Sequence, residues 1–227
     1  MRINRYIASC SVASRRKCDE LITSGRVRIN DKVAELGTLV ADGDVVTVDG
    51  KVVSMPHGFL YIILNKPRGV MTTCYDPQKR KTILDLIPKK ELGGVRIFPV
   101  GRLDYNTEGL LLLTNDGEFT RQLSHPTTKI EKTYIAEIDT PISKEHLRQL
   151  ETGIKIEGEL THPAKAKLIN PTTVELKITQ GRNRQVRKMF EALDYKVYNL
   201  KRTAIGRLQL GNLPRGKYIL SHDKPQI

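Results

Sequence analysis

The segment from residue 98 to residue 117 contains the side chains with the clearest capacity for chemistry. Gly101 and Gly109 bound a polar loop, and four consecutive leucines at 110–113 follow it. The loop holds Arg102, Asp104, Thr107 and Glu108. An all-apolar run is typical of a strand buried on both faces, so the loop lies at the end of a rigid element, where functional residues are often held. A carboxylate such as Asp104 can act there as a base or a nucleophile. The alternative is that Asp104 only hydrogen-bonds its own loop, and the residues alone favour it.

A second segment, residues 180–193, joins an amphipathic helix to a group of cations. Four apolar residues between Val186 and Leu193 have the spacing of one helix face. The cations at its start are Arg182, Arg184, Arg187 and Lys188. Cations at a helix N-terminus oppose the helix dipole, so this arrangement indicates a negatively charged partner, either phosphates or a buried carboxylate. Gly181 does not belong to a G-x-x-x-x-G-K-[ST] motif, which argues against an NTP-binding loop.

Three further polar residues lie in a short turn or a strand-like run. Lys66 belongs to a Pro-Gly turn at residues 65–69, and Lys132 shares one face of a strand-like run with Tyr134. A tyrosine in such a run is more often a sheet or core residue than a catalyst. The five histidines are scattered and the three cysteines match no metal-ligand spacing. The sequence therefore predicts no metal site, and cysteines that are reduced and packed as small apolar side chains.

The charge balance of the chain indicates a polyanionic partner. The 227 residues contain 38 Lys plus Arg against 25 Asp plus Glu, which gives a formal charge of +13. Such a charge attracts nucleic acid first and an anionic membrane surface second. No apolar run approaches the roughly 20 residues that a membrane-spanning helix needs. The first residues contain no signal-peptide apolar region, so we expect a cytoplasmic protein.

Residues 1–58 are predicted to form a small basic module. A helix is expected from about Ser14 to Thr23, with Gly25 as its stop, and short strands at 27–29, 45–48 and 52–53. Residues 1–32 hold eight Lys or Arg against three Asp or Glu, so the positive charge belongs to the helical end. Any single cation there can be a solvated surface residue, but the cluster favours RNA binding. The candidate RNA-binding cations are Arg5, Arg15, Arg16, Lys17 and Arg26.

Residues 59–227 are predicted to form a second, larger domain of the α+β class. The segment 54–58 contains Pro and Gly and has no periodicity, which places the boundary near residue 58. Strands are expected at 60–64, 95–100, 109–114, 131–138, 164–169, 173–179 and 196–200. Helices are expected at 117–124, 143–152 and 183–194. Because the helices are too few for repeated βαβ units, we predict a mixed, mainly antiparallel sheet with flanking helices.

Taken in order, the motifs of the chain resemble the signature of bacterial ribosomal-RNA pseudouridine synthases, in the branch containing the small-subunit enzyme and its large-subunit relatives. The matching motifs are Lys66-Pro67-x-Gly69, Gly101-Arg102-Leu103-Asp104 with Thr107 and the run from Gly109 to Gly117, Lys132-x-Tyr134, and residues 181–187. Gly101 indicates this branch, because the other large branch has His at that position. Residues 1–53 look like the small RNA-binding module named after ribosomal small-subunit protein four. The resemblance therefore covers nearly the whole chain.

The resemblance implies that the protein isomerises a uridine of ribosomal RNA to pseudouridine without a cofactor, nucleotide or metal. Asp104 would be the catalytic carboxylate, which either attacks the anomeric carbon of the target ribose or removes the neighbouring sugar proton. Tyr134 would stack on the uracil and help the late proton removal, and Arg187 would pair with Asp104 and hold it ionised. Because the target must be flipped out of the RNA, a central cleft with cationic walls is implied. The candidates for these walls are Lys66, Arg102, Lys132, Arg182 and Arg184.

The main alternative is a non-catalytic RNA-binding factor for ribosome assembly, which would use the same basic surfaces. A binding protein has no need of a carboxylate facing a polyanion, so Asp104, Tyr134 and Arg187 together separate the two functions. Peripheral membrane binding is a weaker third class, because residues 186–193 resemble core rather than an exposed apolar face. The expected partner is ribosomal RNA, with a mild preference for the large subunit, or an assembly intermediate, bound by a monomer.

Overall fold

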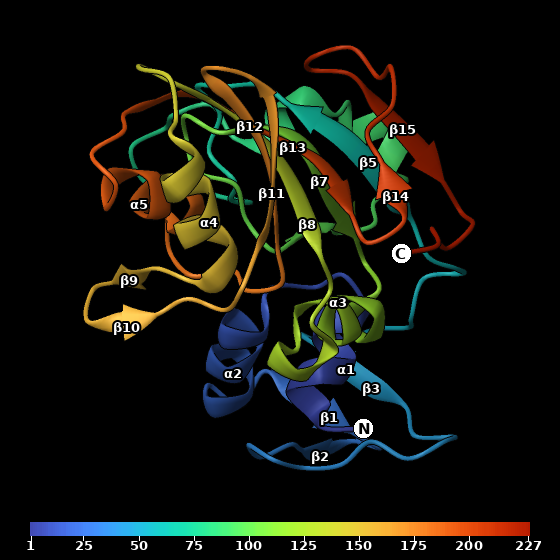
Figure 1. The fold of residues 1–227 in the computed structure, drawn as a ribbon. Coiled ribbons are helices and arrows are strands. Elements are labelled where there is room, and N and C mark those ends of the chain that lie inside the picture. The colour runs from blue at the N-terminus through green and yellow to red at the C-terminus, as the bar shows by residue number, and fades with distance from the viewer.

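Separate hydrophobic cores form in the N-terminal module and in the rest of the chain. The computed structural model describes the backbone of all 227 residues and every side chain except that of Pro126. One core consists of buried residues between Ile3 and Val48, and two clusters in the second domain begin at Leu60 and Tyr61. The two domains follow one another in the chain and lie side by side (Figure 1).

The N-terminal module packs two helices on one face of a small sheet. Its elements are α1 (Ile3–Ser9), α2 (Arg15–Thr23), β1 (Val27–Ile29), β2 (Lys32–Val33), β3 (Val46–Val48) and β4 (Lys51–Val52), with the strand order β2-β1-β3-β4. Ser14 caps α2, because its Oγ accepts a hydrogen bond from the backbone N–H of Lys17. Cys18, Leu21 and Ile22 are buried, so the apolar spacing in the sequence correctly identified the packed face of α2.

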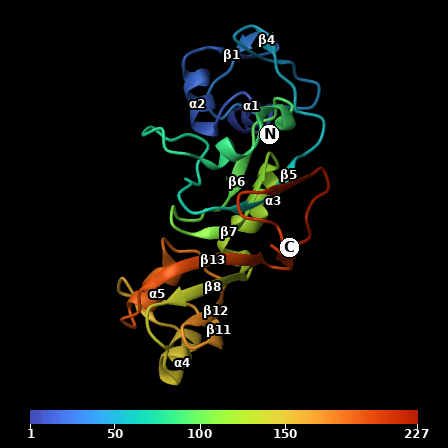
Figure 2. The same ribbon diagram turned by 90° about the horizontal axis from the view of Figure 1, so that it is seen from above.

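The larger domain is built on one long mixed sheet, which is seen from its edge in Figure 2. The strands are β5 (Tyr61–Lys66), β6 (Phe98–Val100), β7 (Glu108–Thr114), β8 (Lys132–Ile138), β11 (Lys165–Asn170), β12 (Thr173–Ile178), β13 (Val197–Ile205), β14 (Leu208–Gln209) and β15 (Tyr218–Ser221). The order along the sheet is β11-β12-β8-β13-β7-β5-β15, with β14 beside β13 and β6 beside β7. The β13–β7 pair is parallel and its neighbours in this order are antiparallel. The predicted fold class is confirmed.

Short helices and one small hairpin surround this sheet. The helices are α3 (Gly117–Ser124), α4 (Lys144–Thr152) and α5 (Gln185–Glu191), with 3-10 turns η1 (Ile83–Leu86), η2 (Lys89–Leu92) and η3 (Pro126–Thr128) and the hairpin β9 (Lys155–Ile156) with β10 (Glu159–Leu160). Asp116 begins α3 by accepting from the backbone N–H groups of Glu118 and Phe119. Among the described residues, no helix has the length and apolar character needed to cross a bilayer.

Several parts of the larger domain differ from the sequence prediction. The expected strand at 196–200 continues to Ile205, and β6 is shorter than the expected strand at 95–100. Four strands were not predicted at all: β9, β10, β14 and β15. The register of β13 against β8 shifts between Val197 and Asn199 and again between Arg202 and Ala204. Such irregularities break the alternation of buried and exposed residues, which is the signal that a strand gives in a sequence.

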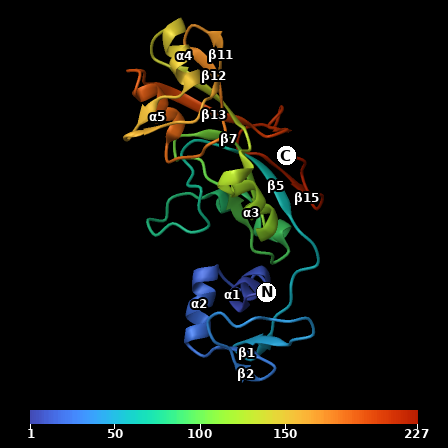
Figure 3. The same ribbon diagram turned by 60° about the horizontal axis from the view of Figure 1, so that its bottom comes forward.

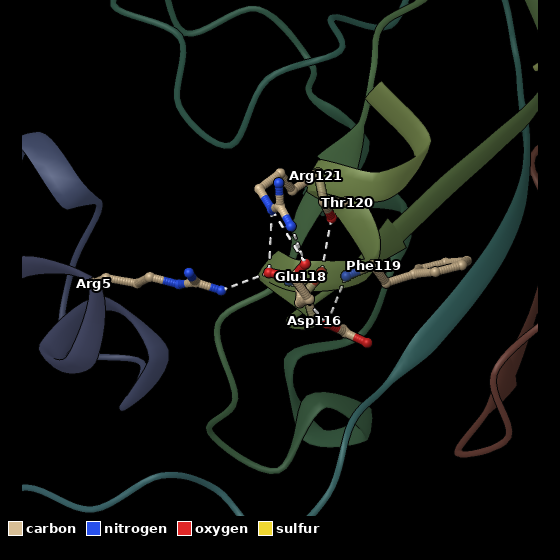
Figure 4. Close-up of polar contacts among 6 residues, drawn as sticks. All are labelled: Arg5, Asp116, Glu118, Phe119, Thr120 and Arg121. Atoms are coloured by element: carbon tan, nitrogen blue, oxygen red, sulfur yellow. Dashed lines mark hydrogen bonds and ion pairs between the residues drawn. The ribbon is translucent and has the colours of Figure 1, made fainter. Parts of the chain in front are cut away.

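Polar groups join the N-terminal module to the larger domain, close to α3 in Figure 3. Arg5 of α1 donates from Nη2 to Oε2 of Glu118 at 2.9 Å, and Arg121 donates to the same carboxylate (Figure 4). Nearby, the backbone N–H of Arg96 donates to Oγ of Ser11 at 3.0 Å. The Arg5 and Glu118 side chains are each 42% exposed. The contact between the domains is therefore partly open to solvent, and such pairs contribute little to stability.

Candidate active site

A cavity of about 600 Å³ opens on the larger domain beside the loop that carries Asp104. Its lining comes from that loop, from β8 and β13, and from the segment that precedes α5. The lining includes the charged residues Arg102, Asp104, Lys132, Arg182, Arg184 and Arg202, together with Tyr134. This volume is typical of a small-molecule or nucleoside site. Asp104 and Tyr134, which are 30 residues apart in the chain, therefore share one cavity.

The Asp104 loop is fixed by hydrogen bonds to its backbone. The backbone N–H of Thr107 donates to the Asp104 carbonyl at 3.0 Å, which closes a turn. On the other side, Thr72 Oγ1 donates to the Leu103 carbonyl at 2.7 Å. The loop then enters β7, all of whose residues are buried. A half-buried carboxylate is thus held at the end of a rigid central strand, as the sequence predicted.

Lys66 supports this loop from beneath, and the prediction that it forms part of an RNA-facing wall is wrong. Its side chain has 0% exposure, so it cannot reach a phosphate. The ammonium group donates to the carbonyl oxygens of Pro67 at 3.0 Å, Asp104 at 3.1 Å and Thr107 at 2.9 Å. Burial lowers the pKa of Lys66 to about 8, although the nearby carboxylates of Asp104 and Glu108 act to raise it. Lys66 therefore holds the backbone of the Asp104 loop in place through the Asp104 and Thr107 carbonyls.

Arg187 also acts on the loop from a buried position, but it does not form the expected ion pair with Asp104. Its guanidinium donates from Nη1 to the Val197 carbonyl at 2.7 Å and from Nη2 to the Asn106 carbonyl at 3.0 Å. Burial lowers the pKa of Arg187, the charge of Arg184 adds to this effect, and the charge of Asp104 opposes it. The Asp104 charge therefore affects Arg187 without a hydrogen bond between their side chains. Within the loop, Arg187 directly contacts the Asn106 carbonyl, two residues beyond Asp104.

Three other arginines that were predicted to meet RNA, Arg102, Arg182 and Arg184, line the cavity and differ in exposure. Arg102 and Arg184 are exposed, and Arg182 binds Glu159 at 2.8 Å at the rim. Arg184 has a left-handed backbone, with φ of 52°, just before α5. The helix therefore begins at Gln185, two residues later than the expected start at 183. These side chains can meet the phosphates of a bound polyanion.

The predicted cations of the N-terminal module lie away from the cavity and differ in their availability. Arg15, Arg16 and Lys17 are exposed on α2, where Lys17 binds Glu20 at 2.6 Å. Two others already have carboxylate partners: Arg26 binds Asp49 at 2.6 Å and Arg5 binds Glu118. Arg15 and Arg16 are therefore the cations of this set best placed to meet RNA directly.

Arg202 lines the cavity, and the sequence reasoning did not identify it. It is 4% exposed on β13, opposite Tyr134 on β8 and Gly109 on β7. The predicted strand stopped at Leu200, and nothing in the alternation of residues 197–205 marks residue 202 as inward-facing. The only signal near it is the Lys201-Arg202 pair within a run of mostly β-forming residues, and that pair does not show which of the two side chains is buried.

The chain has extensive similarity to known proteins. The family described as RNA pseudouridylate synthase matches residues 60–192, and the S4 domain matches residues 1–46. Ribosomal large subunit pseudouridine synthase B of Bacillus subtilis is 46% identical over 225 residues, which is 95% of this chain and 89% of that protein. Dual-specificity RNA pseudouridine synthase RluF of Escherichia coli K12 is 36% identical over 220 residues, which is 96% of this chain and 74% of that protein.

A solved structure agrees with the sequence matches. The structure titled "Crystal structure of pseudouridylate synthase" superposes with a TM-score of 0.71 at 29% identity and covers 97% of this chain and 96% of that one. A coverage of 97% of the chain extends over both domains. This chain belongs to the RNA pseudouridylate synthase family and is an RNA pseudouridine synthase with an N-terminal S4 domain.

Proposed function

We propose that the cavity receives a flipped uridine of large-subunit ribosomal RNA and that the Asp104 carboxylate carries out its isomerisation to pseudouridine. The observation that carries this proposal is the position of Asp104. It is a half-buried carboxylate on a loop anchored from several sides, and it lines the same cavity as Tyr134 and a set of cations. A fixed carboxylate facing a polyanion is costly for binding alone, but a reaction at the sugar requires one.

Each residue of the site has a role in this proposal that matches its position in the structure. Asp104 attacks the anomeric carbon or removes the neighbouring sugar proton. Tyr134 stacks on the uracil within the cavity. Arg187 and Lys66 orient Asp104 through the backbone of its loop. The exposed Arg102 and Arg184 bind the phosphates beside the flipped nucleotide.

The N-terminal module, which we divide from the catalytic domain at residue 58, increases affinity for structured RNA through α2. The preference for the large subunit is supported by the 46% identity with the Bacillus subtilis enzyme, whose name specifies that subunit. We propose that the enzyme acts as a monomer and without a nucleotide cofactor. Net positive charge supports rapid encounter with either free RNA or an assembly intermediate.

The test is pseudouridine mapping of ribosomal RNA taken from a strain that lacks the native enzyme. Large-subunit and small-subunit RNA are incubated separately with the unmodified protein, with Asp104→Asn and with Asp42→Asn, which removes an exposed carboxylate of the module. We expect one new pseudouridine in large-subunit RNA with the unmodified protein and with Asp42→Asn. The rate with Asp104→Asn should fall by roughly 10³-fold or more, because the side chain that reacts is lost.

RNA affinity is measured for the same variants, so that binding and reaction are separated. Asp104→Asn should bind RNA at least as tightly as the unmodified protein, because a negative charge facing the RNA has been removed. If the unmodified protein and Asp104→Asn form pseudouridine at equal rates, Asp104 is not the catalytic carboxylate. If neither forms it on free RNA or on ribosomal particles while both bind, the chain acts as an assembly factor instead.

A further inference from the structure

Two cations lie next to each other in the wall of the cavity, on neighbouring strands. Lys132 begins β8 and Arg202 lies on β13, and both line the cavity together with Asp104. In the register of the two strands Arg202 is opposite Tyr134, and Ile205 is opposite Lys132. Figure 2 shows β8 and β13 side by side. Burial lowers the pKa of Lys132, and the positive charge of Arg202 lowers it further, so the two groups repel each other.

Among the described residues, no carboxylate forms an ion pair with either cation. The nearest acids along these strands have other partners: Glu131 binds Lys165 at 3.0 Å, and Glu108 binds Arg215 at 3.0 Å. The Lys132 ammonium donates to the Ile130 carbonyl at 3.0 Å, and Nε of Arg202 donates to the Leu110 carbonyl at 2.8 Å.

Part of the Arg202 guanidinium has no partner within the described part of the chain. Its Nη2 is buried and forms no hydrogen bond, and the whole residue is 4% exposed. A buried cation with an unused donor is costly, and a second cation beside it increases the cost. The unused donor and the two positive charges favour a ligand in this cavity that accepts hydrogen bonds and carries negative charge. Asp104 lines the same cavity but forms no ion pair with either cation, so the substrate is the candidate for that ligand.

We propose that Arg202, supported by Lys132, binds a carbonyl oxygen of the target uracil and stabilises the negative charge that this ring carries after it leaves the ribose. The proposal rests on the proposed function of Asp104. When the bond between C1′ and N1 breaks, both of its electrons remain on the uracil, where the charge spreads over N1 and the two carbonyl oxygens. C1′ is then bonded to an oxygen of Asp104, or forms a double bond to C2′ while Asp104 takes the C2′ proton. When C5 bonds to C1′, the ester bond to Asp104 breaks, or the C2′ proton returns from Asp104 to the sugar. The C5 proton then leaves and N1 takes up a proton, so the ring is neutral and Asp104 is again a free carboxylate.

The depth of Arg202 favours the base over a phosphate as its ligand. Arg202 lies in the middle of the sheet between β8 and β7, whereas Arg102 and Arg184 are exposed at the opening. A flipped nucleotide enters base first, so its phosphates stay with the exposed arginines. A donor placed where charge develops binds the departing anion more strongly than the neutral uridine, and it therefore accelerates the step.

The test compares two RNA substrates that differ by one fluorine on the target base. Fluorine at C5 stabilises the ring anion, so a 5-fluorouridine target depends less on the enzyme for that stabilisation. Single-turnover consumption of the original nucleoside is measured for uridine and for 5-fluorouridine RNA with the unmodified enzyme, Arg202→Met, Arg202→Lys and Lys132→Met. Arg207→Met is the matched control, because Arg207 is an exposed arginine in the turn that follows β13.

We expect Arg202→Met to slow the uridine reaction by roughly 10²–10³-fold. The 5-fluorouridine reaction should slow at least tenfold less. Lys132→Met should also slow the uridine reaction more than the 5-fluorouridine reaction, but by a smaller factor than Arg202→Met. Arg207→Met should react with both substrates like the unmodified enzyme. The two substrates are compared on one preparation, so a partly unfolded variant lowers both rates equally and leaves their ratio unchanged. If Arg202→Met does not fold, the ratios for Arg202→Lys and Lys132→Met decide the question.

Equal losses on the two substrates would show that Arg202 has only a structural role, and would overturn the inference. Asp104→Asn, measured in parallel, identifies a failure of the underlying function. If it consumes both substrates as fast as the unmodified enzyme, the proposed function is wrong. If it is inactive while the Arg202 losses are equal, only the role of Arg202 is wrong.

Discussion

Gly109→Ala is expected to destabilise the catalytic domain by more than about 4 kcal/mol. An added Cβ would lie 2.2 Å from the carbonyl oxygen and 2.7 Å from the nitrogen of Arg202, and both are backbone atoms of a central strand. The backbone of Gly109 also has φ of +107°, which is unfavourable for any residue with a side chain. Relief of the clash would require β7 and β13 to separate, which would break the parallel pair between them.

Urea unfolding of Gly109→Ala beside Gly94→Ala separates the clash from the backbone strain. Gly94 also has a positive φ, of +79°, but a Cβ there meets nothing within 4 Å. Gly94→Ala should therefore cost only about 1–2 kcal/mol. Similar losses for the two variants would mean that β7 and β13 can separate easily, contrary to the packing described here.

Lys66→Met is expected to lower kcat by roughly 10²-fold, because the loop that carries Asp104 loses its anchor and small displacements of a reacting group are costly. The change leaves three buried carbonyl oxygens without the ammonium donor. The change also removes the free-energy cost of burying a charge, which offsets part of the loss of those hydrogen bonds. Near pH 7 the free energy of unfolding should therefore fall only modestly, although kcat falls strongly. Lys66→Arg should not rescue activity, since the side chain is fully enclosed and a guanidinium is larger.

The difference in free energy of unfolding between the unmodified protein and Lys66→Met should increase in favour of the unmodified protein as the pH rises above about 8. The pKa of Lys66 is about 8 in the folded protein and close to the usual lysine value of 10.5 in the unfolded chain. Between these values the unfolded chain binds more protons, so the Lys66 contribution to stability rises with pH, and it is constant below about 8. Between pH 7.5 and pH 10 the difference in free energy of unfolding between the two proteins should therefore shift in favour of the unmodified one by roughly 2 kcal/mol.

Urea unfolding at pH 7.5 and pH 10 measures this shift, with Lys90→Met, an exposed lysine, as the control. Lys90→Met should follow the unmodified protein at both values. If the difference in free energy of unfolding between Lys66→Met and the unmodified protein is the same at both pH values, the pKa of Lys66 is not lowered in the folded protein. Activity within threefold of the unmodified enzyme would contradict the positioning role.

Sequence reasoning was most successful where one short pattern decides the structure. The four leucines of β7 and the spacing of Cys18, Leu21 and Ile22 in α2 each identify a buried face without reference to the rest of the chain. The motif around Asp104 was found in the same way, because its glycines, carboxylate and following strand are contiguous. The family and the enzyme class followed from these motifs and are confirmed.

The roles of the buried cations were harder to predict, because they depend on segments that are distant in the sequence. Lys66 was expected to face RNA, since a lysine in a Pro-Gly turn is usually exposed. Two of its three acceptors, Asp104 and Thr107, lie 38 and 41 residues later in the chain, and only the pairing of β5 with β7 brings them within reach. Arg187 was expected to contact the Asp104 carboxylate, and it contacts the carbonyl of Asn106 instead. Arg202 was missed because the bulges in β13 hide its inward direction.

The parallel pairing of β13 with β7 has a consequence for how the enzyme is made. The pair joins Lys201 to Glu108 and Arg202 to Gly109, so one wall of the cavity is supplied by a strand more than 90 residues further along the chain. Contacts between such distant segments form late in folding, because closing a long loop costs entropy before any contact compensates for it. During synthesis, the loop of Asp104 emerges well before β13 exists. A growing chain therefore has RNA-binding helices long before it has a place to hold a uridine.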